Sequence, residues 1–396
     1  MSQIMDHAFG RRRVKADMPD MNGRTPLSWA SAEGHEEVVR LLLEREDVNP
    51  DLPNNSDETP LLCAAYRGHE RVVKLLLGRN DVSPDHAEVY YGRTPLFRAV
   101  EMGRWEIVKL LLERKDVNPD RPGNDGRTPL WQAAYEGYEE IVEWLLGRSE
   151  VDPNKPDNNN RTPLSLAAGA GHGGIVKLLL RRKEVDPSMI DLYGRTPLSW
   201  AAEKGHEEVV KALMERADID PNMSDSSGRT PLLWAAQEGH EGVVKLLLDR
   251  REVNPNILGG DSWRPLLWAS YGGHEEVVRL LLERNDVNPN VTDTGHRTPL
   301  SWAVQRGHER IVKLLLERED IKPDIGDNLG QTPLLWAVKC RAGEIVRLLL
   351  EKDANPEIPD NGGQTPLLWA TRRRHRGVLR LLQARKQTAP PARFSS

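Results

Sequence analysis

The chain has 396 residues, of which 29% are charged and 38% hydrophobic, and its formal net charge is −5. This balance is typical of a folded protein, and it excludes a disordered chain and a globally basic, nucleic-acid-binding protein. The apolar runs are too short to cross a membrane, and two cysteines, Cys63 and Cys340, are too few for a disulfide framework or a paired-cysteine metal site.

The two ends of the chain differ from the rest. Residues 1–22 contain no apolar run of the length that a signal peptide needs, and three arginines at 11–13 interrupt them. A complete structural unit first opens at Thr25, so residues 1–22 are interpreted as a degenerate N-terminal segment or partial repeat. Residues 387–396 include two adjacent prolines and are predicted to be a disordered tail.

Between these ends, one pattern returns at a nearly constant interval. It opens with Thr-Pro-Leu, and the threonine or its equivalent stands at Thr25, Thr59, Thr94, Thr128, Thr162, Thr196, Thr230, Arg264, Thr298, Thr332 and Thr365. The interval is 34 residues eight times, 35 once and 33 once. Self-similarity at this period indicates a repeat architecture, which we assign to residues 23–386.

The unit that opens at Thr196 illustrates the local structure. Thr196 is a good helix N-cap, and the proline after it is tolerated at the first helical position. Leucine and alanine at i, i+3 and i+4, with Gly205 at i+7, form one narrow helical face. Gly205-His206 ends this helix, and a second helix with its own apolar face runs on until Asp220-Pro221. Such a short helix pair must stack on its neighbours to bury these faces.

The order Gly-x-Thr-Pro-Leu, Ala-Ala, Gly-His, Val-Val-x-Leu-Leu-Leu and Asp-Val-Asn at this period resembles the ankyrin repeat. The Trp-Ala-Ala variant and the Asp-Val-Asn-Pro ending are similar to long ankyrin arrays of filamentous fungi. The resemblance implies an all-α, right-handed solenoid of eleven stacked helix-turn-helix units with hairpin-like loops. It also implies a concave surface of inner helices and loop tips that contacts a partner.

The pattern departs from the family at several places. The residue after Thr-Pro-Leu is Ser, Leu, Phe or Trp, where the family usually has a histidine bonded to the threonine hydroxyl. The eighth unit has Arg264 in place of threonine, an extra residue lies within 86–91, and the stretch 351–355 is one residue short. We expect local defects at these three places and no break in the solenoid.

Tryptophan is unusually common, with 11 residues against 3 phenylalanines. Seven tryptophans stand four residues after the threonine, namely Trp29, Trp200, Trp234, Trp268, Trp302, Trp336 and Trp369. A helical wheel puts this place about 150° from the Leu-Ala-Ala-Gly face, so the rings are expected to form a ladder along the inner helices. Each indole either covers the seam between neighbouring helices or lines an aromatic groove for a partner.

Three residues further along, a second place varies from copy to copy, which indicates a solvent face that is free to specialise. Together the two places give the predicted partner-binding residues: Trp200, Trp234, Trp268, Trp302, Trp336, Trp369, Tyr271, Gln237 and Gln305. The loop tips are a second candidate surface, although their Asp and Asn residues are also ordinary turn formers.

Two further patterns have plainer interpretations. The histidine of Gly-His recurs once per unit, too far from its next copy to share a metal ion, so it is interpreted as a structural turn residue. The arginine-rich end is interpreted as a polar cap on the last repeat, with a localisation or nucleic-acid patch as the alternative. This basic cluster consists of Arg372, Arg373, Arg374, Arg376, Arg380, Arg385 and Lys386.

The common catalytic motifs, such as a phosphate-binding loop or a nucleophile elbow, do not occur in the sequence. We therefore predict a non-catalytic, monomeric, intracellular scaffold that binds another protein, cytoplasmic rather than nuclear. No cofactor, metal, small-molecule substrate, nucleic acid or membrane is predicted as a ligand. Two alternatives remain open: an accessory or sensor array related to fungal nucleotide-binding receptors, and a purely structural spacer.

Overall fold

The computed structural model describes residues 15–388, with side chains up to residue 384. Within this range the chain forms helices joined by turns and loops, and it contains no strand. The chain divides into two compact units, residues 1–192 and 193–396, with the boundary in a loop between two repeats. Residues 1–14 and 389–396, which the sequence assigns to the N-terminal segment and the tail, lie outside the described residues.

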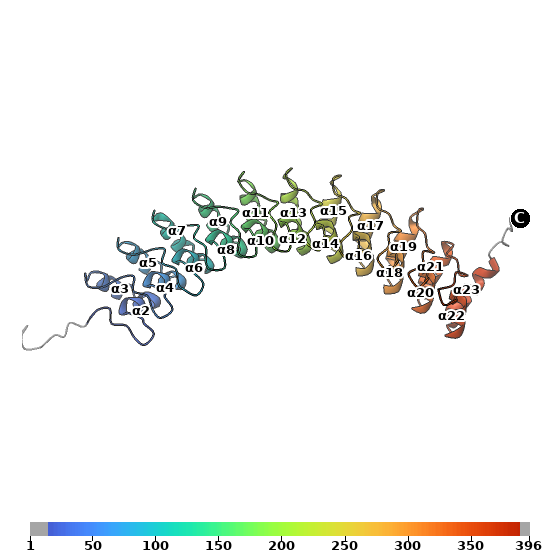
Figure 1. Cartoon of the computed structure of the whole chain (residues 1–396), viewed down its shortest axis with the longest axis horizontal. Helices are drawn as coiled ribbons and strands as arrows, with labels where there is room; N and C mark the ends of the chain where they lie inside the picture. The colour runs from blue at the N-terminus through green and yellow to red at the C-terminus, as the bar shows by residue number, and fades with distance from the viewer. Residues whose placement is uncertain (1–14, 389–396) are drawn as a thin grey trace, which may run out of the picture. The chain divides into compact units, whose positions relative to one another are not determined.

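The described part of the first unit, from residue 15 on, contains five helix pairs, each consisting of a first and a second helix (Figure 1). The pairs are α2 (Pro26–Glu33) with α3 (Glu36–Leu43), α4 (Pro60–Arg67) with α5 (Glu70–Leu77), α6 (Pro95–Glu101) with α7 (Trp105–Glu113), α8 (Pro129–Glu136) with α9 (Glu139–Leu146), and α10 (Pro163–Ala170) with α11 (Gly173–Leu180).

The second unit contains six pairs, and the predicted all-α repeat array is thereby confirmed. The pairs are α12 (Pro197–Lys204) with α13 (Glu207–Met214), α14 (Pro231–Glu238) with α15 (Glu241–Leu248), α16 (Pro265–Gly272) with α17 (Glu275–Glu283), α18 (Pro299–Arg306) with α19 (Glu309–Glu317), α20 (Pro333–Lys339) with α21 (Gly343–Glu351), and α22 (Pro366–Arg372) with α23 (Arg376–Thr388).

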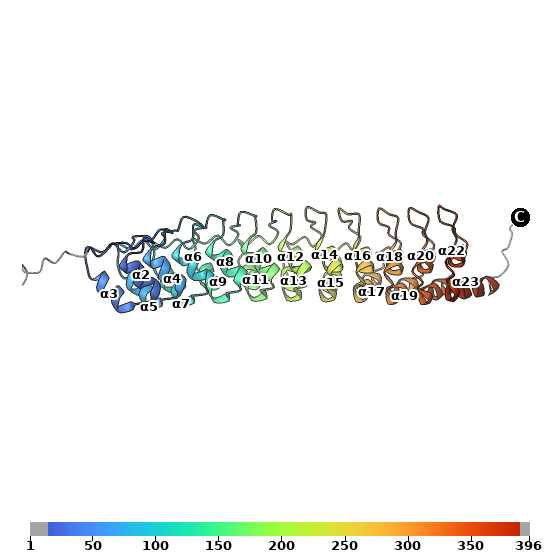
Figure 2. The ribbon, with the colours of Figure 1, turned by 90° about the horizontal axis from the view of Figure 1, so that it is seen from below.

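Within each unit the first helices pack side by side in one row and the second helices in another (Figures 1 and 2). The core lies between the two rows, where the apolar faces predicted from the sequence meet. In the repeat that opens at Thr196 these residues are fully buried: Leu198, Ala201, Ala202, Val209, Val210 and Leu213. No helix of the described residues is long and apolar enough to cross a bilayer.

The threonine before each first helix acts as its N-cap, as predicted. Its hydroxyl accepts a hydrogen bond from the backbone N–H three residues later, for example from Ser301 to Thr298 at 3.1 Å. The hydroxyl of Ser301 also lies 3.0 Å from that of Thr298. The cap therefore does not depend on the histidine that this sequence lacks. Arg264 provides no side-chain cap to α16, and this is the first of the expected local defects.

The two length changes are also absorbed locally. The extra residue lengthens the loop before α6, where Glu88 replaces the shorter aspartate that most other repeats place in this turn. The missing residue after α21 is accommodated by Asp353, whose φ of 59° is left-handed. The helix rows continue past both places, because α4 packs on α6 and α21 on α23.

Two side chains in most repeats reach back to the preceding repeat. The histidine of Gly-His faces a carbonyl of the preceding first helix, as His274 Nε2 does at 3.0 Å from Gln237 O. The arginine after the second helix donates to the end of the preceding one, as Arg318 does to Leu282 O at 2.9 Å. Gly239 makes room for the imidazole, because a Cβ there would lie 2.3 Å from His274 Nδ1. The histidines thus have the structural role expected of them.

The residue after the proline that ends each repeat forms a third contact between repeats. In the second unit this residue is often Asn: Asn222 Oδ1 accepts from Asn254 N at 2.8 Å, and its Nδ2 donates to Glu252 O at 2.7 Å. In the first unit it is often Asp: Asp85 Oδ2 accepts from Asn118 N, but its buried Oδ1 has no partner among the described residues. An ionised carboxylate cannot donate to the carbonyl that an Asn amide would reach.

The substitution Asp85→Asn is predicted to stabilise the protein by about 1 kcal/mol, because the amide can donate where the carboxylate cannot. Burial raises the pKa of Asp85. Because its folded pKa is raised, the contribution of Asp85 to stability is greatest at low pH and falls as pH rises from about 4 through the folded pKa. The variant should lack this decline, which urea unfolding between pH 3.5 and about 7 would measure.

The matched control is Asn222→Asp in the second unit, which should lower stability by a similar amount. If Asp85→Asn leaves stability unchanged or lowers it at neutral pH, the unpaired Oδ1 is not a source of instability.

Candidate binding surface

The surface formed by the first helices and the loops that precede them is called the first-helix face here. In each unit the loops project along one edge of the helix rows (Figure 2). The residues predicted to bind a partner all lie on first helices of the second unit. The structure therefore shows how this face holds each of them.

The tryptophans are fixed by the loop that precedes their own helix. The indole of Trp234 donates from Nε1 to Asp225 Oδ2 at 2.9 Å, while Asp225 Oδ1 accepts from two backbone N–H groups of the turn. The guanidinium of Arg229 lies over the Trp234 ring, 4.6 Å from its centroid. The same aspartate therefore shapes the loop and orients the ring.

This arrangement recurs in later repeats. Trp302 donates to Asp293 at 3.0 Å and carries Arg297 at 3.8 Å above its ring, and Trp336 donates to Asp327 at 3.1 Å. Because loop side chains cover the rings, Trp234 and Trp302 are buried. A helical wheel cannot predict this burial, since it contains only the helix and not the loops folded over it.

Arginine also joins consecutive tryptophans. The guanidinium of Arg195 lies 4.4 Å from the ring of Trp200 in its own repeat and 4.3 Å from the ring of Trp234 in the next. Cation–π contacts of this kind contribute about 0.5–2 kcal/mol each, depending on their exposure. The arginine of Gly-Arg-Thr-Pro is thus part of the ladder, a role that the sequence analysis missed although the residue recurs in most repeats.

The eighth repeat replaces both polar residues of this arrangement. Gly259 stands where most other repeats have the loop aspartate, and Trp263 stands where most have the loop arginine. The Trp263 ring lies 4.5 Å from Trp268 and 5.2 Å from Trp302 between centroids. It therefore takes the place of the guanidinium between the rings of two repeats.

Tyr271 completes this aromatic cluster, with its ring edge-on to Trp263 at 5.4 Å and to Trp302 at 5.0 Å. Without the loop aspartate, the buried Nε1 of Trp268 has no hydrogen-bond partner among the described residues. A buried donor without a partner costs about 1–3 kcal/mol. We call Trp263, Trp268, Tyr271 and Trp302 the aromatic cluster. It contains a buried indole donor, Trp268 Nε1, without a hydrogen-bond partner among the described residues.

The other predicted residues are distributed along the same face. Trp200, Trp336 and Trp369 are half-buried, and Trp369 also contacts the His375 ring. Gln237 donates to Glu238 at 2.9 Å but leaves its buried Oε1 without a partner among the described residues. Gln305 is half-buried at the equivalent place two repeats later. The structure brings Trp268, Tyr271 and Trp302 together and leaves the rest one repeat apart.

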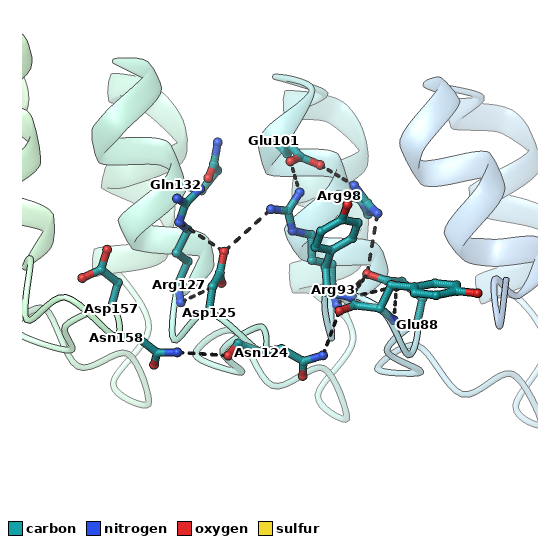
Figure 3. A network of polar contacts seen from close by, with 12 residues as sticks. Glu88, Arg93, Arg98, Glu101, Asn124, Asp125, Arg127, Gln132, Asp157 and Asn158 are labelled. Atoms are coloured by element: carbon teal, nitrogen blue, oxygen red, sulfur yellow. Dashed lines mark hydrogen bonds and ion pairs between the residues drawn. The ribbon is translucent and has the colours of Figure 1, made fainter.

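The first unit carries a different network on this face (Figure 3). Glu88 is buried and accepts from the backbone N–H groups of Tyr90, Tyr91 and Arg93. Arg98 forms ion pairs with Glu88 at 3.6 Å and with Glu101 at 2.8 Å. Every charge in this network is therefore compensated by a partner of opposite sign.

Arg93 extends this network to the next repeat. It pairs with Glu101, and its Nη2 lies 3.8 Å from Asp125 of the loop before α8. Its guanidinium also lies 5.0 Å from the rings of both Tyr91 and Phe97. Beside this network Tyr66, Tyr90 and Tyr135 remain exposed, and the sequence analysis did not select them because no tryptophan ladder runs through these repeats.

The loop aspartates of the predicted contact surface are turn formers, since Asp157, Asp191, Asp225 and Asp293 are buried. Open pockets lie between neighbouring repeats, such as one of about 480 Å³ lined by Lys115, Asp116 and Glu150 among others. No group of His, Cys, Asp and Glu in the described residues could hold a metal ion.

Stacked helix pairs with an aromatic face and projecting loops define a helical repeat scaffold for macromolecular recognition. A family model described as ankyrin repeats (three copies) matches residues 3–87, 80–157, 149–225, 216–293, 251–327 and 319–390. The chain belongs to the ankyrin-repeat family, whose members are in general protein-interaction scaffolds. No curated protein matches the chain at a significant level.

Replacing the buried tryptophans should cost much more stability than replacing the half-buried ones. Trp302→Leu removes a buried ring and leaves Asp293 without its indole donor, so we expect a loss of about 3 kcal/mol. Trp369→Leu should cost about 1 kcal/mol or less, because its ring is partly in solvent. Urea unfolding measures both values, and equal losses would contradict the burial described.

The two cysteines should differ in reactivity because the thiolate is the reactive form. Cys63 takes the tryptophan place in the second repeat, and burial raises the pKa of its thiol to about 12. Burial also raises the pKa of Cys340, but this side chain is exposed. A thiol reagent at about pH 8 should modify Cys340 in the native protein and Cys63 only after unfolding. Native labelling that persists in Cys340→Ser would contradict this assignment.

Proposed function

We propose that this chain is a non-catalytic scaffold that binds a protein partner through the first-helix face and loops of its second unit. This is the surface that the sequence predicted to be concave. The contact residues are the nine selected from the sequence, with Trp200, Trp268, Trp336, Trp369, Tyr271, Gln237 and Gln305 touching the partner. Trp234 and Trp302, which are buried, support the others from beneath.

One observation carries the proposal: Trp268 holds a buried indole N–H with no acceptor among the described residues, in the middle of an aromatic cluster. In three other repeats the equivalent donor is satisfied by the loop aspartate, as in Trp234, Trp302 and Trp336. Because this N–H is buried in the free protein, binding requires the Trp268 ring to turn toward the partner, and a carbonyl or carboxylate supplied there would then remove the cost. Tryptophan and tyrosine rings held rigidly by their neighbours also lose little entropy when a partner covers them.

The proposal also covers the cellular compartment and the oligomeric state of the protein. We place its action inside the cell, in the cytoplasm, as a monomer, because both cysteines are free thiols and an ankyrin face needs no second copy to be complete. A structural spacer is the competing function, and the burial of Trp234 and Trp302 is the observation in its favour.

The test compares Trp268→Phe with Trp234→Phe. A partner is first identified with a photo-crosslinking amino acid that replaces Gln237. Its affinity for the purified chain is then measured by calorimetry. Trp268→Phe keeps an aromatic ring and removes only the unpaired donor, so we expect unchanged or higher stability and affinity reduced by about tenfold.

Trp234→Phe is the matched control, because its donor is already bound to Asp225. It should lower stability and leave the affinity of folded protein nearly unchanged. If Trp268→Phe binds as well as wild type, and crosslinks arise equally from Glu140 on the second-helix side, the first-helix face is not the binding surface.

A further inference from the structure

Positive charge accumulates toward the end of the first-helix face in the second unit. Over the ten residues that start at the helix proline, the formal charge is +1 in the ninth repeat, +2 in the tenth and +3 in the eleventh. The same segment carries between −1 and +1 in each of the first eight repeats. The helices concerned, α18, α20 and α22, pack side by side (Figure 1).

These cations lack the carboxylate partners that other cations on first-helix faces have. Arg195 pairs with Glu203, and Arg98 with Glu101. Within the described residues, none of the six basic side chains in these three ten-residue segments forms an ion pair with a carboxylate: Arg306, Lys339, Arg341, Arg372, Arg373 and Arg374. We call these six residues the basic surface.

Several members of the basic surface are held over aromatic rings. Arg306 lies 4.0 Å from the centroid of Tyr271, and Lys339 lies 5.4 Å from that of Trp336. Arg373 lies 5.5 Å from the centroid of Trp369. A ring fixes the position of a cation without neutralising its charge, so the charge stays available to an anionic ligand.

The aspartates in the loops before α20 and α22 already accept hydrogen bonds within their own repeats. Asp327 accepts from Leu329 N and Gln331 N at 2.9 Å and from the indole of Trp336. Asp360 accepts from Gly362 N and Gln364 N in the next loop. Glutamine replaces the loop arginine in both repeats, which removes the cation that stacks on the ladder elsewhere.

Two members of the basic surface occupy positions that favour glycine. Arg341 has a φ of 59° and Arg374 a φ of 55° at the residue that ends the first-helix turn. In the other nine repeats this residue is Gly with positive φ, for example Gly307 at 77°. A left-handed conformation is unfavourable for arginine, and strained positions of this kind cluster at functional sites.

We propose that the basic surface binds an acidic segment of a protein partner. This inference rests on the proposed function and names the chemistry of the partner: a short run of Asp or Glu lying across α18, α20 and α22. Guanidinium groups that have no carboxylate partner within the protein are suited to bidentate carboxylate recognition. A protein segment fits better than nucleic acid, because the net charge of −5 gives the whole chain no attraction for an extended polyanion.

The test uses fluorescence anisotropy with a fluorescein-labelled peptide of about twelve residues that alternates Glu and Ser. We expect saturable binding to the full chain that weakens as salt rises, and a loss of affinity of about tenfold or more in Arg372→Gln/Arg373→Gln/Arg374→Gln. The control removes the same number of exposed arginines from second helices or their C-caps, as Arg71→Gln/Arg181→Gln/Arg310→Gln, and should bind like wild type.

Arg374→Gly separates binding from folding. Glycine relieves the left-handed strain, so the variant should melt at the same or a higher temperature while binding the peptide more weakly. Failure of the wild type to bind the peptide, equal losses in both triple variants, or tighter binding of a single-stranded oligonucleotide of equal charge would each overturn the proposal. A partner that still crosslinks at the aromatic cluster would then show that only the acidic-segment inference had failed.

Discussion

The structure depends on one constraint: a helix of two turns cannot bury its own apolar face. Each pair must therefore be covered by the pairs beside it, and packing between repeats supplies the core. Polar contacts that cross the same interfaces fix the register, as the imidazole of His274 does on Gln237 O and the guanidinium of Arg318 on Leu282 O. Since most repeats are held in this way, the residues that face solvent between the contacts are free to differ.

The loops fix the positions of the side chains on the first-helix face. A buried aspartate such as Asp225 shapes its turn with one oxygen and orients an indole with the other. Arginines then separate the rings of neighbouring repeats, as Arg195 does for Trp200 and Trp234. When the eighth repeat exchanges the aspartate for Gly259 and the arginine for Trp263, the ring stack survives but an indole donor loses its acceptor. Where the loop aspartate is present the tryptophans are packing residues, and we propose that the eighth repeat, where it is absent, offers a binding site.

The charge of the first-helix face also differs from repeat to repeat. In the first unit Glu88 and Glu101 compensate Arg93 and Arg98, so this face presents exposed tyrosines and little free charge. In the last three repeats the acidic partners are missing, and the cations rest on aromatic rings instead. One face can therefore offer an aromatic contact in one repeat and a basic contact in the next, with no change in the helices that carry them.

The sequence by itself determined the helix pairs, their caps, the core residues and the family, because these follow from local periodicity that is repeated eleven times. It also located the ladder, but it could not separate the buried Trp302 from the half-buried Trp369, which stand in the same place of their repeats. That difference depends on loops folding over the helix, so only the tertiary structure decided it. The roles of Trp263 and of the left-handed Arg374 were decided in the same way, because they depend on neighbours a whole repeat away and on a backbone angle that no residue pattern specifies.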